Sequence, residues 1–202
     1  MKKSNKILLF VISLIIIACG LYVYMENEYK TGVSDGLAYR NQNLSVGDYY
    51  INKQYGFKII PPAYWAIADE NKADGIPVEF VDRIKNVQGL IRVSFINTPT
   101  ITYSNFDASV NDSLQKVKDA SGVSFVSNQK IASSMTPSYL LEYIIDANKG
   151  AGYQGSGKDH MLQLTTLLKN GQIYIVTGMV DEAMWASFKD VVKNSLLSFS
   201  VY

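Results

Sequence analysis

The chain has a single histidine, His160, and any Ser/His/Asp relay or histidine-ligated metal site would have to include it. Asp159 precedes it directly, but consecutive residues of a strand point to opposite faces of a sheet, so these two side chains cannot form a relay with each other. No H-E-x-x-H zinc motif and no recognisable nucleophile elbow accompanies the imidazole. We therefore predict an ordinary surface or strand-entry histidine, assign no catalytic or metal-ligating residue, and do not expect an enzyme.

A small acidic cluster, Asp69, Glu70 and Asp74, follows Trp65 and carries the oxygen ligands that calcium prefers. Its spacing does not fit an EF-hand loop, and Lys72 lies within it. A solvated loop is the better interpretation of this segment, and the sequence indicates no cofactor.

Residues 148–158, NKGAGYQGSGK, place four glycines before a lysine, as a phosphate-binding loop does. A P-loop needs Ser or Thr after the lysine and a helix beyond it, whereas Lys158 is followed by Asp159 and a β-type run. We predict a mobile hairpin loop, which is also the kind of segment from which partner-contacting loops are drawn.

The strongest signal is an uncharged run from Ile7 to Met25, preceded by Lys2, Lys3 and Lys6. A helix of nineteen residues rises roughly 28 Å, which is enough to cross a bilayer once. Lysines on the amino-terminal side predict a cytoplasmic amino terminus by the positive-inside rule, so the rest of the chain is expected outside the cytoplasm.

Two interpretations of this run stay open. Ile16-Ile17-Ala18-Cys19 resembles a lipobox, in which Cys19 would be lipidated after cleavage of a signal peptide. The run continues apolar beyond Cys19, and Tyr22 and Tyr24 suit the interfacial belt of an uncleaved helix. Both interpretations tether the chain to the cytoplasmic membrane. The expected organisation is an anchor or lipoprotein-type signal at 1–25, a flexible linker at 26–48 and one domain at 49–202.

Charge and cysteine content exclude several classes of protein for the part after residue 25. It holds all 18 acidic residues and 16 of the 19 basic ones, so its net charge is about −2. Nucleic-acid binding is not expected, because no basic footprint is present to neutralise phosphates. Cys19 is the only cysteine, which excludes an intramolecular disulfide and a cysteine-based zinc site.

The domain alternates strand patterns with two helix patterns. Helical spacing of apolar residues predicts a helix at Asp107–Ala120 and a closing helix that opens near Asp181. Antiparallel strands with packed helices define the α+β class. The predicted strands are Tyr49–Ile51, Phe57–Ile60, Val78–Val81, Leu90–Ile96, Tyr139–Asp146, Met161–Leu168 and Gln172–Met179.

Two local features are specific enough to test. Asn170-Gly171, between the last two strands, predicts a two-residue type I′ hairpin turn. The closing helix is predicted to bury one apolar face, and Trp65 and Trp185 are predicted to be core residues. That helical face consists of Met184, Trp185, Phe188, Val191 and Val192.

The order of several short motifs resembles the PsbP-like domain family, named after an extrinsic subunit of photosystem II. Gly56-Phe57-Lys58-Ile59-Ile60-Pro61 with Trp65 is similar to the opening of that domain, and the similarity extends over about residues 49–202. Later landmarks in the same order are Val78–Asp82, Leu90–Val93, Leu141–Tyr143, Asn170–Tyr174, the helix with Trp185, and Ser195–Phe199.

The resemblance implies an antiparallel sheet flanked by helices, an α/β/α sandwich. In plant and cyanobacterial members it implies stabilisation of the oxygen-evolving centre. The amino-terminal run of this chain is one apolar span and does not resemble a Ser- and Arg-rich plastid transit peptide, so a photosynthetic role is not expected. No metal-site residue is carried over from the family. We expect a membrane-anchored extracytoplasmic binding or scaffold domain for an envelope protein partner, with binding residues unknown. The alternative is a small-molecule or metal-ion binding protein of the cell envelope.

Overall fold

The computed structural model describes residues 47–63, 65–73, 76–82, 89–131, 136–146, 148–149, 157–168 and 171–202, with the side chains of 69–73 excepted. The predicted anchor, Cys19 and most of the predicted linker lie outside these ranges. Among the helices in these ranges, none is long and apolar enough to cross a bilayer.

Seven antiparallel strands form the main sheet, in the order β3-β4-β5-β9-β8-β7-β6. A second sheet has the order β1-β2-β10. The main-sheet strands are β3 (Trp65–Ala73), β4 (Ile76–Asp82), β5 (Gly89–Asn97), β6 (Val123–Ile131), β7 (Ser138–Asp146), β8 (Lys158–Leu167) and β9 (Gln172–Asp181). The small sheet consists of β1 (Tyr50–Asn52), β2 (Phe57–Ile59) and β10 (Ser200–Val201).

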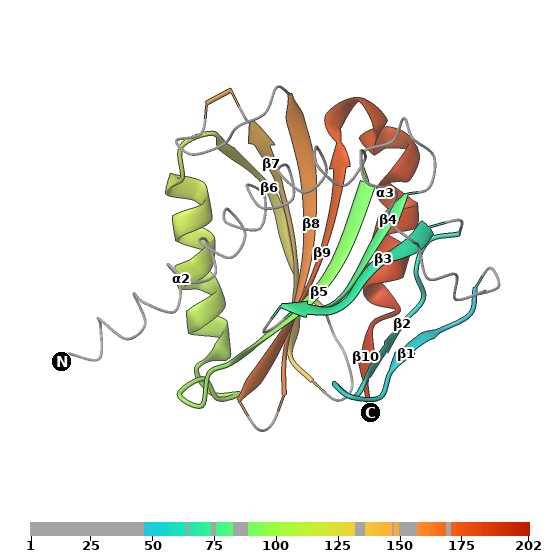
Figure 1. Cartoon of the computed structure of the whole chain (residues 1–202). Coiled ribbons are helices and arrows are strands. Elements are labelled where there is room, and N and C mark those ends of the chain that lie inside the picture. Colours follow the sequence, from blue (N-terminus) through green and yellow to red (C-terminus); the bar gives the residue numbers. More distant parts are fainter. Residues whose placement is uncertain are drawn as a thin grey trace.

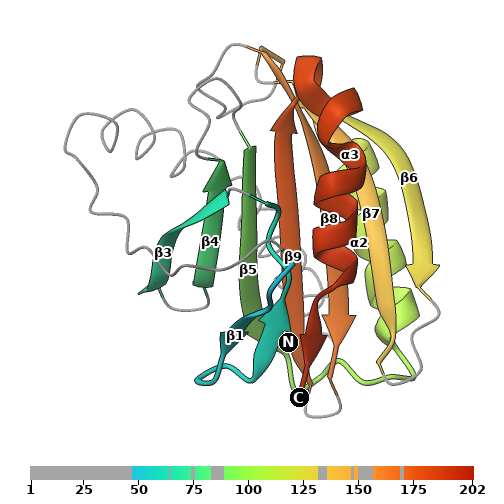
Figure 2. The same cartoon turned by 90° about the vertical axis from the view of Figure 1, so that its right-hand side faces the viewer.

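Helix α2 (Phe106–Asp119) covers one face of the main sheet, while α3 (Glu182–Leu197) and the small sheet lie on the other (Figures 1 and 2). The same strand contributes side chains to the cores on both faces of the sheet, because successive residues of β9 point to opposite faces. Tyr174 and Val176 join the core on the α3 side, and Ile173 and Ile175 join the core with α2. The predicted α+β class and the antiparallel sheet flanked by helices are confirmed.

The sequence missed three strands: the short β10 of the small sheet, and β3 and β6, which are the two edges of the main sheet. Among the strands that the structure describes, β3 pairs with β4 alone and β6 pairs with β7 alone. Edge strands often carry charged and polar residues that prevent pairing with other chains, so their apolar alternation is weak. Asp69 and Glu70 therefore belong to β3, and the predicted loop there was wrong; Asp74 lies outside the described residues.

The β8–β9 hairpin is confirmed, but its connection is longer than the predicted two-residue turn. Leu167 pairs with Ile173, the Leu168 amide donates to the Gln172 carbonyl at 2.8 Å, and the Gly171 amide donates to the Leu168 carbonyl at 3.0 Å. The strands end at Leu167 and begin again at Gln172, so four positions, 168–171, separate them. Gly171 has a φ of 79°, the left-handed residue that such a connection requires. Asn170 lies outside the described residues.

Helix α3 begins as predicted, since the Asp181 carboxylate accepts a hydrogen bond of 2.7 Å from the Ala183 amide. Trp185 and Val192 are buried, and Met184 and Phe188 are partly buried against the same core. Val191 is 41% exposed, so its predicted burial was wrong. Val192 faces the sheet, and the residue before it is turned about 100° around the helix axis toward solvent.

Helix α3 approaches the main sheet directly over Gly178 of β9. A Cβ atom at this glycine would lie 2.3 Å from Val192 Cγ1 and 3.3 Å from Leu196 Cδ1. Both helix residues are fully buried. The missing side chain of Gly178 therefore sets how close the helix packs.

We expect Gly178→Ala to destabilise the chain by about 1–3 kcal/mol, because overpacking displaces α3 from the sheet. Val192→Ala alone should also destabilise it, through the cavity that it leaves. The double variant should cost less than the sum of the two, since the shorter side chain at position 192 lacks the clashing Cγ1 atom. Urea unfolding of the detergent-solubilised chain, followed by tryptophan fluorescence, measures all three. Strict additivity would contradict the contact.

Candidate functional site

His160 is the third residue of β8, so the strand-entry alternative was right, but it is buried, with 8% of its surface exposed, and the surface alternative was wrong. Its imidazole stacks on the Trp185 indole, with ring centroids 4.7 Å apart and planes inclined by 18°. His160 shares its face of β8 with Leu162 and Leu164, both buried under α3. That alternation was visible in the sequence and would have predicted an inward-facing histidine.

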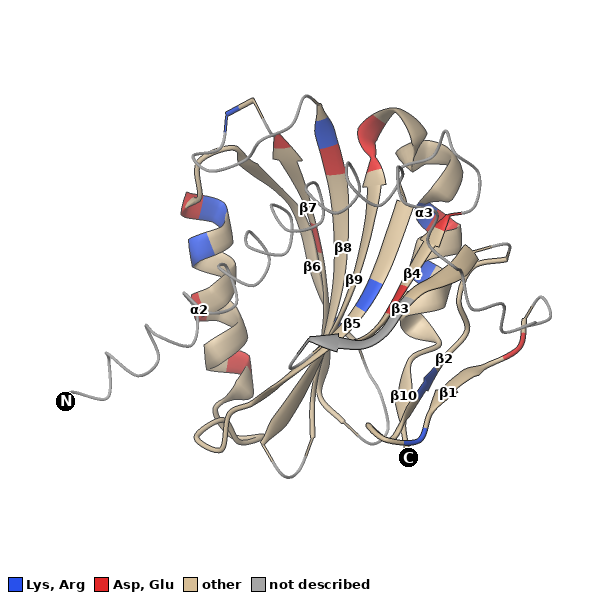
Figure 3. Cartoon of the chain, viewed as in Figure 1, with Lys and Arg blue, Asp and Glu red and all other residues tan. Residues whose placement is uncertain are grey.

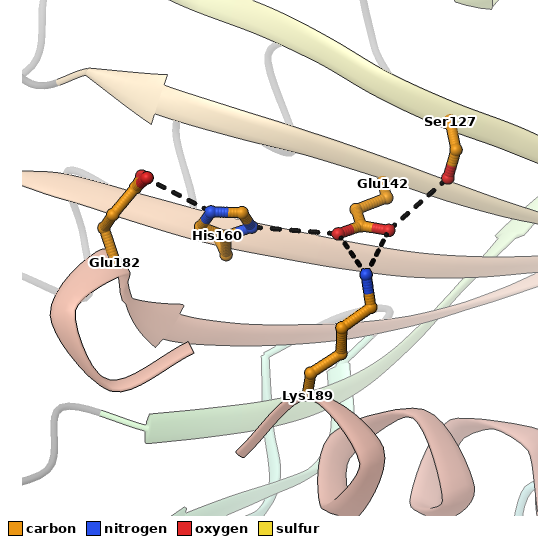
Figure 4. A network of polar contacts seen from close by, with 5 residues as sticks. All are labelled: Ser127, Glu142, His160, Glu182 and Lys189. Atoms are coloured by element: carbon orange, nitrogen blue, oxygen red, sulfur yellow. Dashed lines mark hydrogen bonds and ion pairs between the residues drawn. The ribbon is translucent and has the colours of Figure 1, made fainter. Parts of the chain in front are cut away.

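Two carboxylates flank the imidazole (Figure 4). His160 Nε2 lies 3.4 Å from Glu182 Oε2, and Nδ1 lies 3.9 Å from Glu142 Oε1. Within the described part of the chain, Nδ1 is buried and makes no hydrogen bond. The ring thus stacks on one aromatic face and has a carboxylate near each of its nitrogens.

Glu142 is the centre of the network. Lys189 Nζ donates to both of its carboxylate oxygens, at 3.0 and 3.2 Å, and the Ser127 hydroxyl donates to Oε2 at 3.4 Å (Figure 4). Glu142 is 7% exposed, whereas the Lys189 side chain is 43% exposed. A nearly buried carboxylate is therefore neutralised by a lysine that reaches it from the rim.

Sheet register and helical spacing bring these residues together. Ser127 of β6 lies opposite Glu142 of β7, and His160 of β8 lies opposite Ile144, two residues beyond Glu142 on the same face. From α3, three side chains at positions 182, 185 and 189 follow one stripe of the helix surface. We call Ser127, Glu142, His160, Glu182, Trp185 and Lys189 the α3 clamp, because it joins three strands to this helix.

The clamp geometry differs from that of a hydrolytic triad. In a triad the serine hydroxyl donates to the histidine and the carboxylate orients the imidazole. Here Ser127 donates to Glu142, and that carboxylate is already paired with Lys189. The arrangement neutralises charge and positions a helix, and it leaves the hydroxyl unactivated.

Asp159, next to His160 in sequence, lies opposite Asp181 of β9. Its side chain projects from the other face of β8, as the alternation requires. The predicted hairpin at 148–158 joins β7 to β8, where Asp146 pairs with Lys158; the glycine-rich positions 150–156 lie outside the described residues. In the described ranges no three His, Cys, Asp or Glu side chains gather as metal ligands.

Both tryptophans are core residues, as predicted, with Trp65 8% and Trp185 7% exposed. Trp65 packs against Gly89, where a Cβ atom would lie 2.8 Å from the indole Cζ2 atom. Trp185 has an additional role that the sequence did not indicate, since it stacks on His160.

Other polar contacts also went unpredicted from the sequence. Glu79 of β4 and Arg92 of β5 face each other across the ladder and form a buried ion pair. At the surface, Lys130 Nζ lies 2.6 Å from Asp107 Oδ2 and ties β6 to α2. This hydrogen bond lowers the pKa of the Asp107 carboxyl. No local motif marks either pair, because strand register and helix docking create them.

Comparisons with known proteins agree with this architecture. The family model PsbP matches residues 47–201. The solution structure of cyanobacterial PsbP (CyanoP) from Synechocystis sp. PCC 6803 is 22% identical, with a TM-score of 0.50 over 77% of this chain and 92% of that one.

Two further solved structures share the fold. The Saccharomyces cerevisiae Ran-binding protein Mog1p is 12% identical, with a TM-score of 0.53 over 76% of this chain and 94% of its own. LpqN of Mycobacterium tuberculosis, involved in cell envelope biogenesis, is 10% identical, with a TM-score of 0.50 over 72% of this chain and 82% of its own. At these identities the likenesses show the fold alone. Among curated proteins, none matches the chain.

We expect Lys189→Met to destabilise the chain by about 1–3 kcal/mol, because Glu142 would stay buried without its cation. Glu142→Gln together with Lys189→Met should cost less than the two single changes combined, since no buried charge is then left. Lys193→Met on the same helix is the matched control and should stay within about 0.5 kcal/mol of the parent chain. Equal urea midpoints for Lys189→Met and Lys193→Met would refute the clamp.

Proposed function

Because the chain belongs to the PsbP family, we propose that it is a membrane-anchored extracytoplasmic domain that binds or scaffolds a protein partner in the cell envelope, without catalysis. The observation that carries this proposal is the α3 clamp. The only histidine of the sequence and the carboxylates beside it lie in the contact between α3 and the sheet, where Lys189 pairs with Glu142, so this set of side chains serves packing. A rigid surface built on such a scaffold suits recognition.

Proteins of the same fold lend support to the binding role. Mog1p is a Ran-binding protein, and LpqN is involved in cell envelope biogenesis. The fold thus occurs in one protein that binds another protein and in one that has a role in the cell envelope. The partners of those proteins are not carried over to the present chain. For this chain we infer only the class of the partner, a protein of the envelope.

The proposed contact surface is the end of the sandwich where α3 begins. Gly157, at the end of the β7–β8 connection, lies against the amino terminus of α3, since a Cβ at this glycine would be 4.0 Å from Asp181 Oδ2. Lys149 and Lys158 flank the connection, and the Lys149 side chain is 74% exposed. The clamp directly below holds this end in a defined shape.

The proposed membrane attachment is supported by the uncharged run Ile7–Met25 and its preceding lysines. We keep the proposed division into an anchor or lipoprotein-type signal at 1–25, a linker at 26–48 and the domain at 49–202. In a chain carrying Cys19→Ser, Ser45→Cys should react with an impermeant thiol reagent in intact cells. Labelling only after lysis would contradict the topology.

The amino terminus of the native chain distinguishes the uncleaved helix from the lipidated Cys19. Mass spectrometry of its amino terminus should find either a peptide beginning near Met1, as for an uncleaved helix, or an acylated Cys19 as the first residue. An unmodified amino terminus beyond Cys19 would contradict both forms of the tether.

Partner contact is tested by photo-crosslinking from the intact, membrane-embedded chain. A photoreactive residue at Lys149 or Lys158 should give one discrete protein adduct, the same from both positions, because both flank the proposed surface. The control position is Asn111, on the exposed face of α2, and it should give no such adduct. An adduct pattern at Lys149 and Lys158 that equals the pattern at Asn111 would overturn the proposed surface.

A further inference from the structure

The small sheet exposes an unusual share of apolar side chains. Seven large apolar residues are exposed in the described ranges, and three of them belong to or border this sheet. Tyr49 is 42%, Ile51 54% and Tyr202 66% exposed. The sheet itself has only eight strand residues, so these side chains are concentrated in a small area.

The three side chains lie on one face. Ile51 is opposite Lys58, and Lys58 is opposite Ser200, so these residues project together, away from the buried Tyr50 and Phe57. Lys58 Nζ lies 4.6 Å from the centroid of the Tyr49 ring, which places that tyrosine on the same side. Tyr202 follows by alternation two residues after Ser200. We call Tyr49, Ile51, Lys58, Ser200 and Tyr202 the outer face of the small sheet.

The outer face is held in place by the fold. The Tyr202 amide donates to the Gly56 carbonyl at 3.1 Å, and its hydroxyl donates to the Asn52 carbonyl at 3.3 Å. Behind it, Phe57 and Ile59 are fully buried in the main core. The exposed Tyr202 is therefore held in position by hydrogen bonds to the small sheet and its turn.

The composition of the outer face matches the interface between lipid headgroups and acyl chains. Tyrosine rings prefer that zone because they combine an apolar body with a polar hydroxyl. Lysines on long stems reach anionic headgroups, and Lys58 and Lys53 are both on or beside this face. In Figure 3 blue segments, which mark Lys or Arg, lie on the small sheet near the carboxyl terminus.

The outer face also lies where the proposed tether enters the domain. Tyr49 comes directly after the proposed linker, residues 26–48. A flexible linker of this length has an end-to-end distance of roughly 25 Å, which keeps the entry point close to the bilayer. Tethering gives an effective concentration on the order of millimolar, so even a weak lipid affinity is sufficient for contact.

We propose that the outer face of the small sheet rests on the lipid surface and orients the domain on the membrane. This inference rests on the proposed membrane tether and goes beyond it, because a tether alone leaves every orientation open. With the small sheet on the bilayer, its residues Tyr49, Ile51 and Tyr202 enter the headgroup zone.

The test uses the full chain with Cys19→Ser, reconstituted in vesicles of phosphatidylcholine and phosphatidylglycerol. An environment-sensitive fluorophore at Ser200→Cys reports on the outer face without removing its apolar side chains. The same fluorophore at Val126→Cys, on edge strand β6, is the control, because Val126 is 44% exposed. We expect several-fold less quenching by aqueous iodide, and more by nitroxide-labelled lipid, at position 200 than at position 126. Equal iodide quenching would overturn the proposal.

Variants identify the residues responsible. Tyr49→Ser with Ile51→Ser and Tyr202→Ser should return the label at position 200 to the iodide quenching of the control position. Val191→Ser, which removes an exposed apolar side chain from α3, should leave the iodide quenching at position 200 unchanged. Lys53→Glu with Lys58→Glu should remove any extra protection that phosphatidylglycerol provides over phosphatidylcholine alone. Protection that persists in the triple serine variant would contradict the assignment to these side chains.

Two further readouts separate the possible failures. If the chain does not float with vesicles after alkaline carbonate extraction, the tether itself is wrong and this inference falls with it. If the chain floats but iodide quenches the label equally at positions 200 and 126, only the proposed orientation is wrong. Protection that grows with protein density at constant lipid would mean a second copy on this face, and would also overturn the lipid contact.

Discussion

The close contact between α3 and β9 is the interaction on which the rest of the structure depends. Gly178 has no side chain at the point where Val192 and Leu196 pack, so the helix lies directly on the sheet. The far end of the helix then reaches the small sheet, where the Ser195 hydroxyl donates to the Ile60 carbonyl at 2.6 Å and the Ile60 amide donates to the Ser198 hydroxyl at 2.8 Å. A single helix thereby joins both sheets.

The clamp fixes the other end of the same helix. Burying Glu142 carries a desolvation cost that only a cation and hydrogen bonds offset, and Lys189 and Ser127 supply them. The stacked rings of His160 and Trp185 fill the space beside Glu142, so the core stays well packed there. Charge neutralisation and aromatic contact together select one position of α3, because sliding the helix would leave a buried carboxylate without its partner.

The two proposed interaction surfaces lie at opposite ends of α3. The clamp and the β7–β8 connection lie where the helix begins, while the small sheet lies where it ends (Figure 2). In the proposed arrangement the small sheet faces the bilayer and the beginning of α3 faces away from it. Because one rigid helix separates the two ends, contact of the small sheet with lipid would hold the partner surface at a constant height above the membrane.

The sequence alone determined those features that depend on local patterns. The uncharged run and its lysines, the strong alternation of the central strands, the Asp181 cap and the left-handed Gly171 each follow from neighbouring residues. The family resemblance added the sandwich, because the order of its motifs spans the whole domain.

Only the tertiary structure decided the contacts that join distant segments. The edge strands β3 and β6 were missed because edge strands often carry polar and charged residues. Such residues weaken the apolar alternation from which a strand is predicted. The burial of His160, the pairing of Glu142 with Lys189 and the pairing of Glu79 with Arg92 depend on strand register and on the docking of α3. Such contacts cannot be predicted from local patterns, because the two residues of each pair are far apart in the sequence. Only the packed fold brings them within hydrogen-bonding distance.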